Sequence, residues 1–303
     1  MAEIPILTHT GSPQSDPEWR MVYSGISHKD SHNPTFFRHN YNSVNLFNLY
    51  EGETVYLIGR GPSLGEFVEN KEIKELLLHP TIVRYGMNSS PEVIDNRVSI
   101  WSGVDKVSKF SPLVYKNPNI LKLIPMHRLV SDGSKPNTNM GKDKLAYDNV
   151  HISNCPNTIG VQCCLIEESK KLSFGSAFLG APAVLFGVKH GSKSVFLFSL
   201  KICLLLGFSK IVLIGIDFDM DINQPYYKMG RDSHNAFHTK HNNKLYKNLT
   251  PKIKEIYDIL KSNKNIYKSQ IYTAKEITSM PFIPTINLKE DLAETIKIKL
   301  NKK

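Results

Sequence analysis

The chain has 303 residues, 41% of them hydrophobic, so it can bury a sizeable core without disulfides or a structural metal. Its four cysteines lack the paired spacing of a zinc site or a disulfide framework, and we interpret them as reduced thiols of a cytoplasmic protein. Thirty-eight Lys and Arg residues against 28 Asp and Glu give a formal net charge of +10, which favours a polyanionic partner such as nucleic acid, anionic lipid or phosphorylated saccharide.

We divide the chain into predicted regions according to where the periodic pattern of hydrophobic residues begins and ends. Residues 1–50 show little periodicity and predict an irregular N-terminal arm. We expect a catalytic domain over residues 51–285, with a variable substrate-binding region at about 106–170. Residues 286–303 are basic and predict a solvated C-terminal tail.

Apolar runs and helical spacing alternate along the catalytic domain. Buried strands are predicted at residues 54–58, 81–85, 98–101, 210–218 and 271–273. Helices are predicted at residues 65–77, 195–206 and 240–262, with a helix or strand–helix pair at 174–188. Strand, glycine turn and helix in succession form the first half of a doubly wound unit, so we predict a Rossmann-like α/β fold with a mostly parallel sheet.

A membrane-spanning segment is not expected. Residues 1–27 are polar and lack the apolar stretch of a signal peptide. Residues 195–216 are apolar, but Lys201, Gly207 and Lys210 interrupt them, and a turn is expected at 206–210. We therefore predict a buried helix followed by a buried strand.

A glycine turn follows the first predicted strand. Gly59 and Gly61 let the backbone turn tightly and approach a ligand, and Ser63 can cap the next helix or donate to a phosphate. This pattern, with Arg60 between the glycines, predicts a nucleotide-binding turn. A plain tight turn between strand and helix remains the alternative.

Polar residues after later strands extend this candidate nucleotide site. Asn88 follows the second predicted strand, and the segment 102–105 follows the third. Ligands of open parallel sheets bind at these carboxyl ends. Ser192 and Ser194 precede the apolar helix, where hydroxyls either cap a helix or contact phosphate.

Carboxylates end the strongest predicted strand. Asp217 and Asp219 would hold a divalent metal that bridges a diphosphate. The alternative is that Asp217 is a structural carboxylate and Asp219 a loop residue, so metal dependence stays open.

Three histidines lie close together in residues 231–241. His234 and His238 are four residues apart, which suits metal ligands on a helix, but the sequence offers no third ligand. A histidine near its ordinary pKa can instead remove a proton from an acceptor hydroxyl.

Three motifs together resemble the bacterial sialyltransferases of glycosyltransferase family 42. The Gly-Asn-Gly-Pro-Ser-Leu turn of that family is similar to residues 59–64, and its Leu-Gly-Tyr-x-x-Ile-x-Leu-x-Gly-Ile-Asp-Phe unit resembles residues 206–218. Its Ser-His-x-x-x-His-Ser-Lys motif is similar to residues 233–240. The resemblance rests on these three short motifs and implies a Rossmann-like fold and inverting sugar transfer.

The resemblance assigns roles to individual residues. The second histidine of the family motif is the catalytic base, which here is His238. Where the family has a nucleotide-binding Asn the chain has Arg60, and where it has a tyrosine after Ile-Asp-Phe the chain has Asp219.

Stabilisation of the departing phosphate falls to residues near this motif. The family's other tyrosine corresponds to Tyr226 or Tyr227. Either tyrosine, together with Lys240 or Arg231, would stabilise the negative charge.

The sequence therefore predicts a glycosyltransferase with a nucleotide sugar as co-substrate. The positive charge leads us to a phage-type enzyme that glycosylates hydroxymethylated bases of DNA in a bacterial or phage-infected host cytoplasm. The rival acceptor is a cell-surface saccharide, as for a sialyltransferase. Two other classes stay open: an enzyme like the archaeal pterin pyrophosphokinases, which share the glycine turn and would need Asp217 and Asp219, and a non-enzymatic nucleic-acid-binding accessory protein.

Overall fold

The structure is a computed structural model, and it describes residues 36–37, 43–44, 46, 48–105, 107–125, 145–148, 150–161, 194–218, 227–228, 236–262, 264 and 268–302. The predicted segment 174–188 and several candidate site residues lie outside these ranges, namely Ser192, Asp219, Tyr226, Arg231 and His234.

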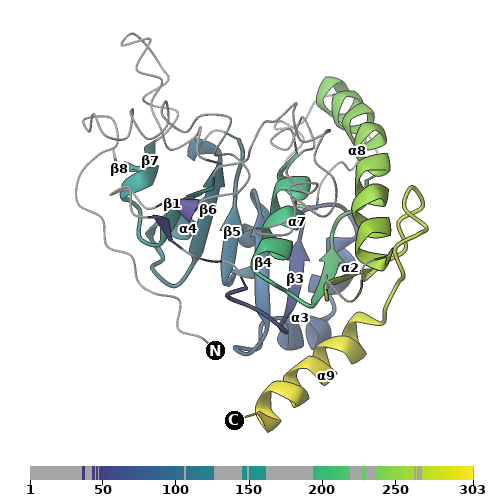
Figure 1. Cartoon of the computed structure of the whole chain (residues 1–303). Helices are drawn as coiled ribbons and strands as arrows, with labels where there is room; N and C mark the ends of the chain where they lie inside the picture. Colours follow the sequence, from purple (N-terminus) through teal and green to yellow (C-terminus); the bar gives the residue numbers. More distant parts are fainter. Residues whose placement is uncertain are drawn as a thin grey trace. The chain divides into compact units, whose positions relative to one another are not determined.

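The chain divides into two compact units. The first contains Met1–Phe47 and Ser99–Lys201, and the second contains Asn48–Val98 and Ile202–Lys303. Both are built from parallel strands and helices (Figure 1), which confirms the predicted Rossmann-like α/β fold.

The strands of the second unit lie in the order β11-β10-β3-β4, and all are parallel. They are β3 (Thr54–Ile58), β4 (Val83–Met87), β10 (Lys210–Ile214) and β11 (Gln270–Thr273). Strand β10 ends earlier than predicted because Gly215, with φ 64°, turns the chain. The chain passes from β3 to β4 and later returns to β10 on the other side of β3, so the strand order reverses between β3 and β10.

Helices of the second unit are α2 (Leu64–Val68), α3 (Lys71–Leu77), α8 (Ala236–Ser262) and α9 (Leu288–Asn301), together with the short 3-10 helix η1 (Ser90–Ile94). The single helix predicted at 65–77 is therefore two helices. The break falls at Asn70, whose side-chain oxygen accepts a hydrogen bond from the N–H of Ile73 at 3.2 Å and caps α3.

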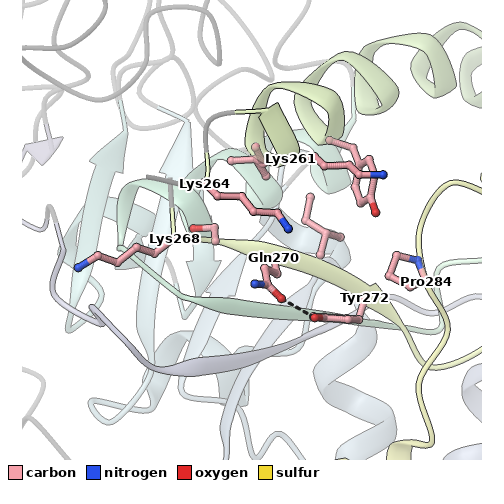
Figure 2. A pocket seen from close by; sticks show the side chains of 10 residues that line it. Lys261, Lys264, Lys268, Gln270, Tyr272 and Pro284 are labelled. Atoms are coloured by element: carbon pink, nitrogen blue, oxygen red, sulfur yellow. Dashed lines mark hydrogen bonds between the residues drawn. The ribbon is translucent and has the colours of Figure 1, made fainter. Parts of the chain in front are cut away.

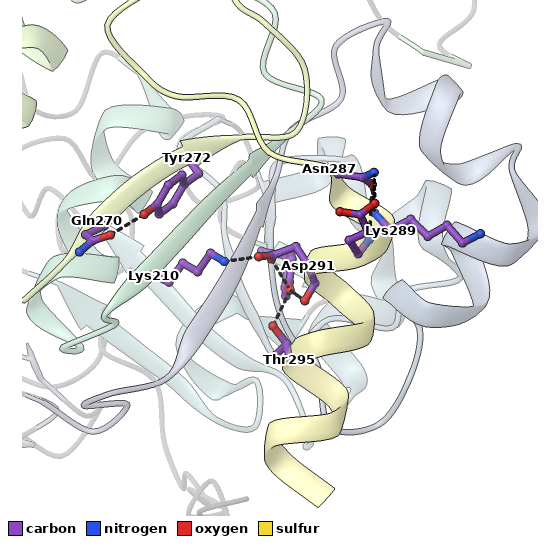
Figure 3. A network of polar contacts seen from close by, with 9 residues as sticks. Lys210, Gln270, Tyr272, Asn287, Lys289, Asp291 and Thr295 are labelled. Carbon is purple, nitrogen blue, oxygen red and sulfur yellow. Dashed lines mark hydrogen bonds and ion pairs between the residues drawn. The ribbon is translucent and has the colours of Figure 1, made fainter.

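Residues 286–303 differ from the expected solvated tail, because they contain helix α9, which packs against α3. The Tyr56 hydroxyl on β3 donates to Oδ2 of Asp291 at 2.8 Å and lies 3.0 Å from Oγ1 of Thr295. Lys210 on β10 forms an ion pair with the same Asp291 (Figure 3). Burial raises the pKa of Tyr56. This buried network fixes α9 to the sheet.

The described residues of the first unit form three parallel strands in the order β5-β6-β9, extended by two antiparallel ones. Its strands are β5 (Ile100–Ser102), β6 (Leu121–Pro125), β9 (Thr158–Val161), β1 (Phe36–Phe37) and β2 (Ser43–Val44), with the separate pair β7 (Leu145–Tyr147) and β8 (Val150–His151). Its helical elements are α4 (Pro112–Lys116), η2 (Val107–Lys109) and η4 (Ile152–Asn154). The expected variable region thus supplies β6 and β9 of the larger sheet and the separate pair β7 and β8, and the expected irregular arm supplies β1 and β2.

Lys122 is a fully buried lysine in the first unit. Its Nζ donates to the carbonyl oxygens of Asn117 at 2.7 Å, Ile120 at 3.0 Å and Pro156 at 2.6 Å. Burial lowers the pKa of Lys122 to about 7. The side chain ties together the segments that lead into β6 and β9.

Helix α7 (Val195–Leu205) matches the predicted buried helix, and even Lys201 on it is only 3% exposed. Among the described residues, every helix is too short or too polar to cross a bilayer.

Candidate functional site

The turns after β3 and β10 meet at the point where the strand order reverses. The N–H of Gly59 donates to the carbonyl oxygen of Ile214, and the N–H of Gly61 donates to that of Gly215, both at 2.8 Å. These bonds continue the pairing of the two strands beyond the sheet. The glycine turn is therefore held from one side by the chain that follows β10.

The two glycines are required by this close approach of backbone to backbone. A Cβ at Gly59 would overlap the carbonyl oxygen of Gly215, and a Cβ at Gly61 would overlap Oδ2 of Asp217. Any side chain at either position would push the turns apart. Contacts within the protein thus account for both glycines.

Asp217 lies at the start of helix α2. Its Oδ2 accepts a hydrogen bond from the N–H of Ser63 at 3.0 Å, across 154 residues of sequence. Free N–H groups at a helix start attract an anion, and here the chain supplies its own carboxylate. No cluster of three metal-binding side chains occurs in the described part of the chain. The hydrogen bond from Ser63 makes Asp217 a brace between the two turns.

Arg60, predicted to bind nucleotide, ties three segments together. Its Nε and Nη2 donate to the carbonyl oxygens of Tyr227 and Lys228, each at 3.0 Å. Its Nη1 donates to the carbonyl oxygen of Ser89 at 3.1 Å and to Oε2 of Glu92 at 2.8 Å. The Arg60 side chain is only 11% exposed, and its charge is neutralised by the carboxylate of Glu92, which lies at the surface.

Tyr227 packs over the start of α2. Its hydroxyl donates to Oε1 of Glu69 at 2.7 Å, and its N–H donates to the carbonyl oxygen of Arg60 at 3.0 Å. The ring leaves no room for a Cβ at Gly65. Lys228 lies over the same ring, with its Nζ 4.9 Å from the ring centre. The hydroxyl predicted to face a departing phosphate instead contacts Glu69.

Asn88 follows β4 in the left-handed region, with φ 49°. The neighbouring Ser90, which the sequence did not single out, is fully buried and connects the two strand ends. Its Oγ donates to the carbonyl oxygen of Ile58 at 2.8 Å and accepts from the N–H of Met87 at 2.9 Å. A serine before a proline gives no local signal for such a link, so sequence reasoning missed it. The link brings the Asn88 turn beside the glycine turn.

The histidine motif leads into helix α8. The backbone of His238 and Lys240 lies in the first two turns of this helix, which begins at Ala236. Arg231, His234 and Tyr226 lie outside the described residues.

The remaining predicted residues belong to the first unit. Ser194 is buried immediately before α7, and its carbonyl oxygen accepts from the N–H of Phe198 at 3.1 Å. Ser102 is also buried, and its Oγ donates to the carbonyl oxygen of Leu123 at 2.7 Å. These contacts are structural.

Comparison with known proteins gave no match to a family model, to a curated protein or to a solved structure. By its fold, the chain is an α/β protein. Its glycine turn lies where the strand order reverses and is held by hydrogen bonds to the chain after β10.

Proposed function

We propose that the chain is a nucleotide-sugar-dependent glycosyltransferase whose donor binds beyond the carboxyl ends of β3, β4 and β10. The observation that carries this proposal is the meeting of the turns after these strands at the reversal of strand order, where open α/β sheets bind their ligands. The three motifs that resemble family 42 sialyltransferases all belong to the second unit, as these strands do.

Asp217 and Arg60 hold the donor-binding turn in place in this proposal. Asp217 fixes the backbone at Ser63, and Arg60 fixes the turn to residues 227–228. A rigid turn costs less conformational entropy when the donor binds. The donor is then contacted by outward-facing backbone of the turn and by Asn88.

Chemistry is assigned to the start of α8. His238 removes the proton of the acceptor hydroxyl, and that oxygen attacks the anomeric carbon of the donor sugar. The bond from the anomeric carbon to the donor phosphate breaks, and the phosphate leaves with the electron pair. Lys240, Arg231 and Tyr226 are the groups proposed to stabilise its charge.

The acceptor in this proposal is DNA that carries hydroxymethylated bases. The net charge of +10 supports it, because a basic protein attracts the phosphate backbone and does so less at high salt. Transfer to a galactose-terminated oligosaccharide, with none to hydroxymethylated DNA, would favour the surface-saccharide acceptor instead.

The experiment has two stages. Thermal shifts against CMP-, UDP- and GDP-sugars, with and without Mg²⁺, identify the donor. Turnover of His238→Ala is then compared with that of the matched control His241→Ala. We expect His238→Ala to lower turnover about 10²–10⁴-fold with donor affinity unchanged, because general-base catalysis is worth that much. The wild-type rate should rise with pH through the histidine range, and the variant should lack this rise.

Two results would reject the proposal. Full turnover in His238→Ala, together with a metal-dependent activity lost in Asp217→Ala and Asp219→Ala, would favour the pyrophosphokinase-like enzyme. DNA binding without a thermal shift from any nucleotide would favour the accessory protein.

A further inference from the structure

A pocket of about 430 Å³ lies where the end of helix α8 meets strand β11. Lys261 is in the last turn of α8, Lys264 follows the helix, and Lys268 precedes the strand (Figure 2). Gln270, Ile271 and Tyr272 also line the pocket. We call it the basic pocket.

The basic pocket is positively charged. Its lining contains three lysines and no Asp or Glu among the described residues. Lys268 pairs with Glu51 at 3.3 Å, whereas neither Lys261 nor Lys264 has an ion pair within the described part of the chain. Like charges held around one cavity repel, and an anion bound between them removes that repulsion.

Neutral groups complete the basic pocket. The Tyr272 hydroxyl donates to Oε1 of Gln270, which leaves the Gln270 amide N–H groups available to a ligand (Figure 2). Leu260 and Ile271 are buried and form an apolar floor. Lysines and an amide above an apolar floor are the combination that binds a small anionic ligand.

A purely structural role explains only part of this arrangement. A lysine in the last turn of a helix offsets the negative end of the helix dipole, and Lys261 has that position. Lys264 and Lys268 come from outside the helix, so the dipole does not explain why they line the same cavity.

We propose that the basic pocket binds a phosphate group. The site goes beyond the proposed function: helix α8 has 27 residues and is about 40 Å long, so its last turn lies far from His238 in its first turn. Lysine is a common point-charge ligand of phosphate, and a pocket of this size holds a compact phosphorylated ligand.

The test uses the full chain and three proteins. They are the wild type, Lys261→Gln/Lys264→Gln, and the control Lys297→Gln/Lys302→Gln, which loses the same charge at exposed positions in α9 and directly after it. Inorganic phosphate is titrated into each by calorimetry at low salt, and circular dichroism checks folding. We expect the pocket variant to bind phosphate about tenfold more weakly than both other proteins. Equal affinity in all three proteins, or no binding to the wild type, would overturn the proposal.

A labelled ten-nucleotide thymidine oligomer distinguishes the source of the phosphate. If inorganic phosphate displaces the oligomer, and only the pocket variant binds the oligomer more weakly, the ligand is a phosphodiester of nucleic acid. Phosphate binding that the oligomer does not compete with identifies a free phosphate monoester. A donor thermal shift that the pocket variant keeps in full reports on the glycosyltransferase proposal separately, since no pocket lysine belongs to the glycine turn.

Discussion

The glycine turn and the basic pocket differ in whether their charged and polar side chains have partners within the protein. Around the glycine turn, Asp217 accepts from Ser63, Arg60 is neutralised by Glu92, and Tyr227 donates to Glu69. In the basic pocket, three lysines line a cavity whose described lining contains no carboxylate. The first region satisfies its polar groups within the protein, and the second leaves charge for a ligand.

The difference teaches that a charged residue in a motif is not thereby a ligand contact. Buried polar groups must find partners, and in a turn between two parallel strands the nearest partners are other parts of the chain. Charges at the edge of a sheet stay solvated until a ligand arrives. Substitutions that separate internal bracing from ligand binding can therefore test both regions.

The largest effect is expected for Lys122, which is the most deeply buried lysine among the described residues and is compared with an exposed lysine of the basic pocket. Lys122→Met removes the Nζ that donates to three buried or part-buried carbonyl oxygens, so we expect a loss of about 3–5 kcal/mol in the free energy of unfolding, measured by urea denaturation. Lys261→Met, at an exposed position, should change it by less than about 0.5 kcal/mol. Similar unfolding free energies for the two variants would show that the buried Lys122 contributes no more to stability than the exposed Lys261.

The pH dependence of stability adds to this test. The pKa of Lys122 falls from its ordinary value of 10.5 to about 7 in the folded protein. Between these values the unfolded chain binds the proton more tightly, so Lys122 makes the wild type more stable as pH rises from about 7 to 10.5, with no slope from this group below 7. The stability difference between wild type and Lys122→Met should therefore grow from pH 7 to pH 9. A constant difference would show that the lysine stays charged in the folded protein.

The next effect is expected at Gly61. Its valine variant would force a side chain against Asp217 and Gly215, and we expect a loss of about 2–4 kcal/mol in unfolding free energy. Gly52→Ala is the control, because a Cβ there meets nothing within 4 Å and only φ 81° is strained, at about 1 kcal/mol. A Gly61→Val variant that is as stable as the wild type but binds no donor would show that glycine is needed here to leave room for the donor, and not to leave room for Asp217.

The smallest effect is expected at Asp217. Asp217→Asn keeps an acceptor for the Ser63 N–H and should cost under about 1 kcal/mol, while Asp217→Ala should cost about 1–2 kcal/mol. Donor affinity, read by thermal shift, should fall only in the alanine variant. Asp258→Ala, which removes an exposed ion pair with Lys254, is the control. A metal-dependent activity lost in Asp217→Asn at full stability would instead make Asp217 a metal ligand.

Local signals in the sequence determined the strands β3 and β10, the glycine turn between strand and helix, and the buried helix α7. Apolar runs and glycines act on the backbone beside them, so their effect can be seen in a short segment. The same signals predicted one helix at 65–77. The structure has two helices there, because the side chain of Asn70 caps the start of the second.

Tertiary structure alone decided what these elements contact. Asp217 meets Ser63 across 154 residues, and Tyr56 meets Asp291 across 235, so neither partner could be found from local sequence. Residues 286–303 look like a basic tail by charge, yet they contain α9 because a buried tyrosine and a lysine on the sheet hold Asp291. The basic pocket likewise exists only because α8 ends over β11, since each lysine alone is an ordinary surface charge.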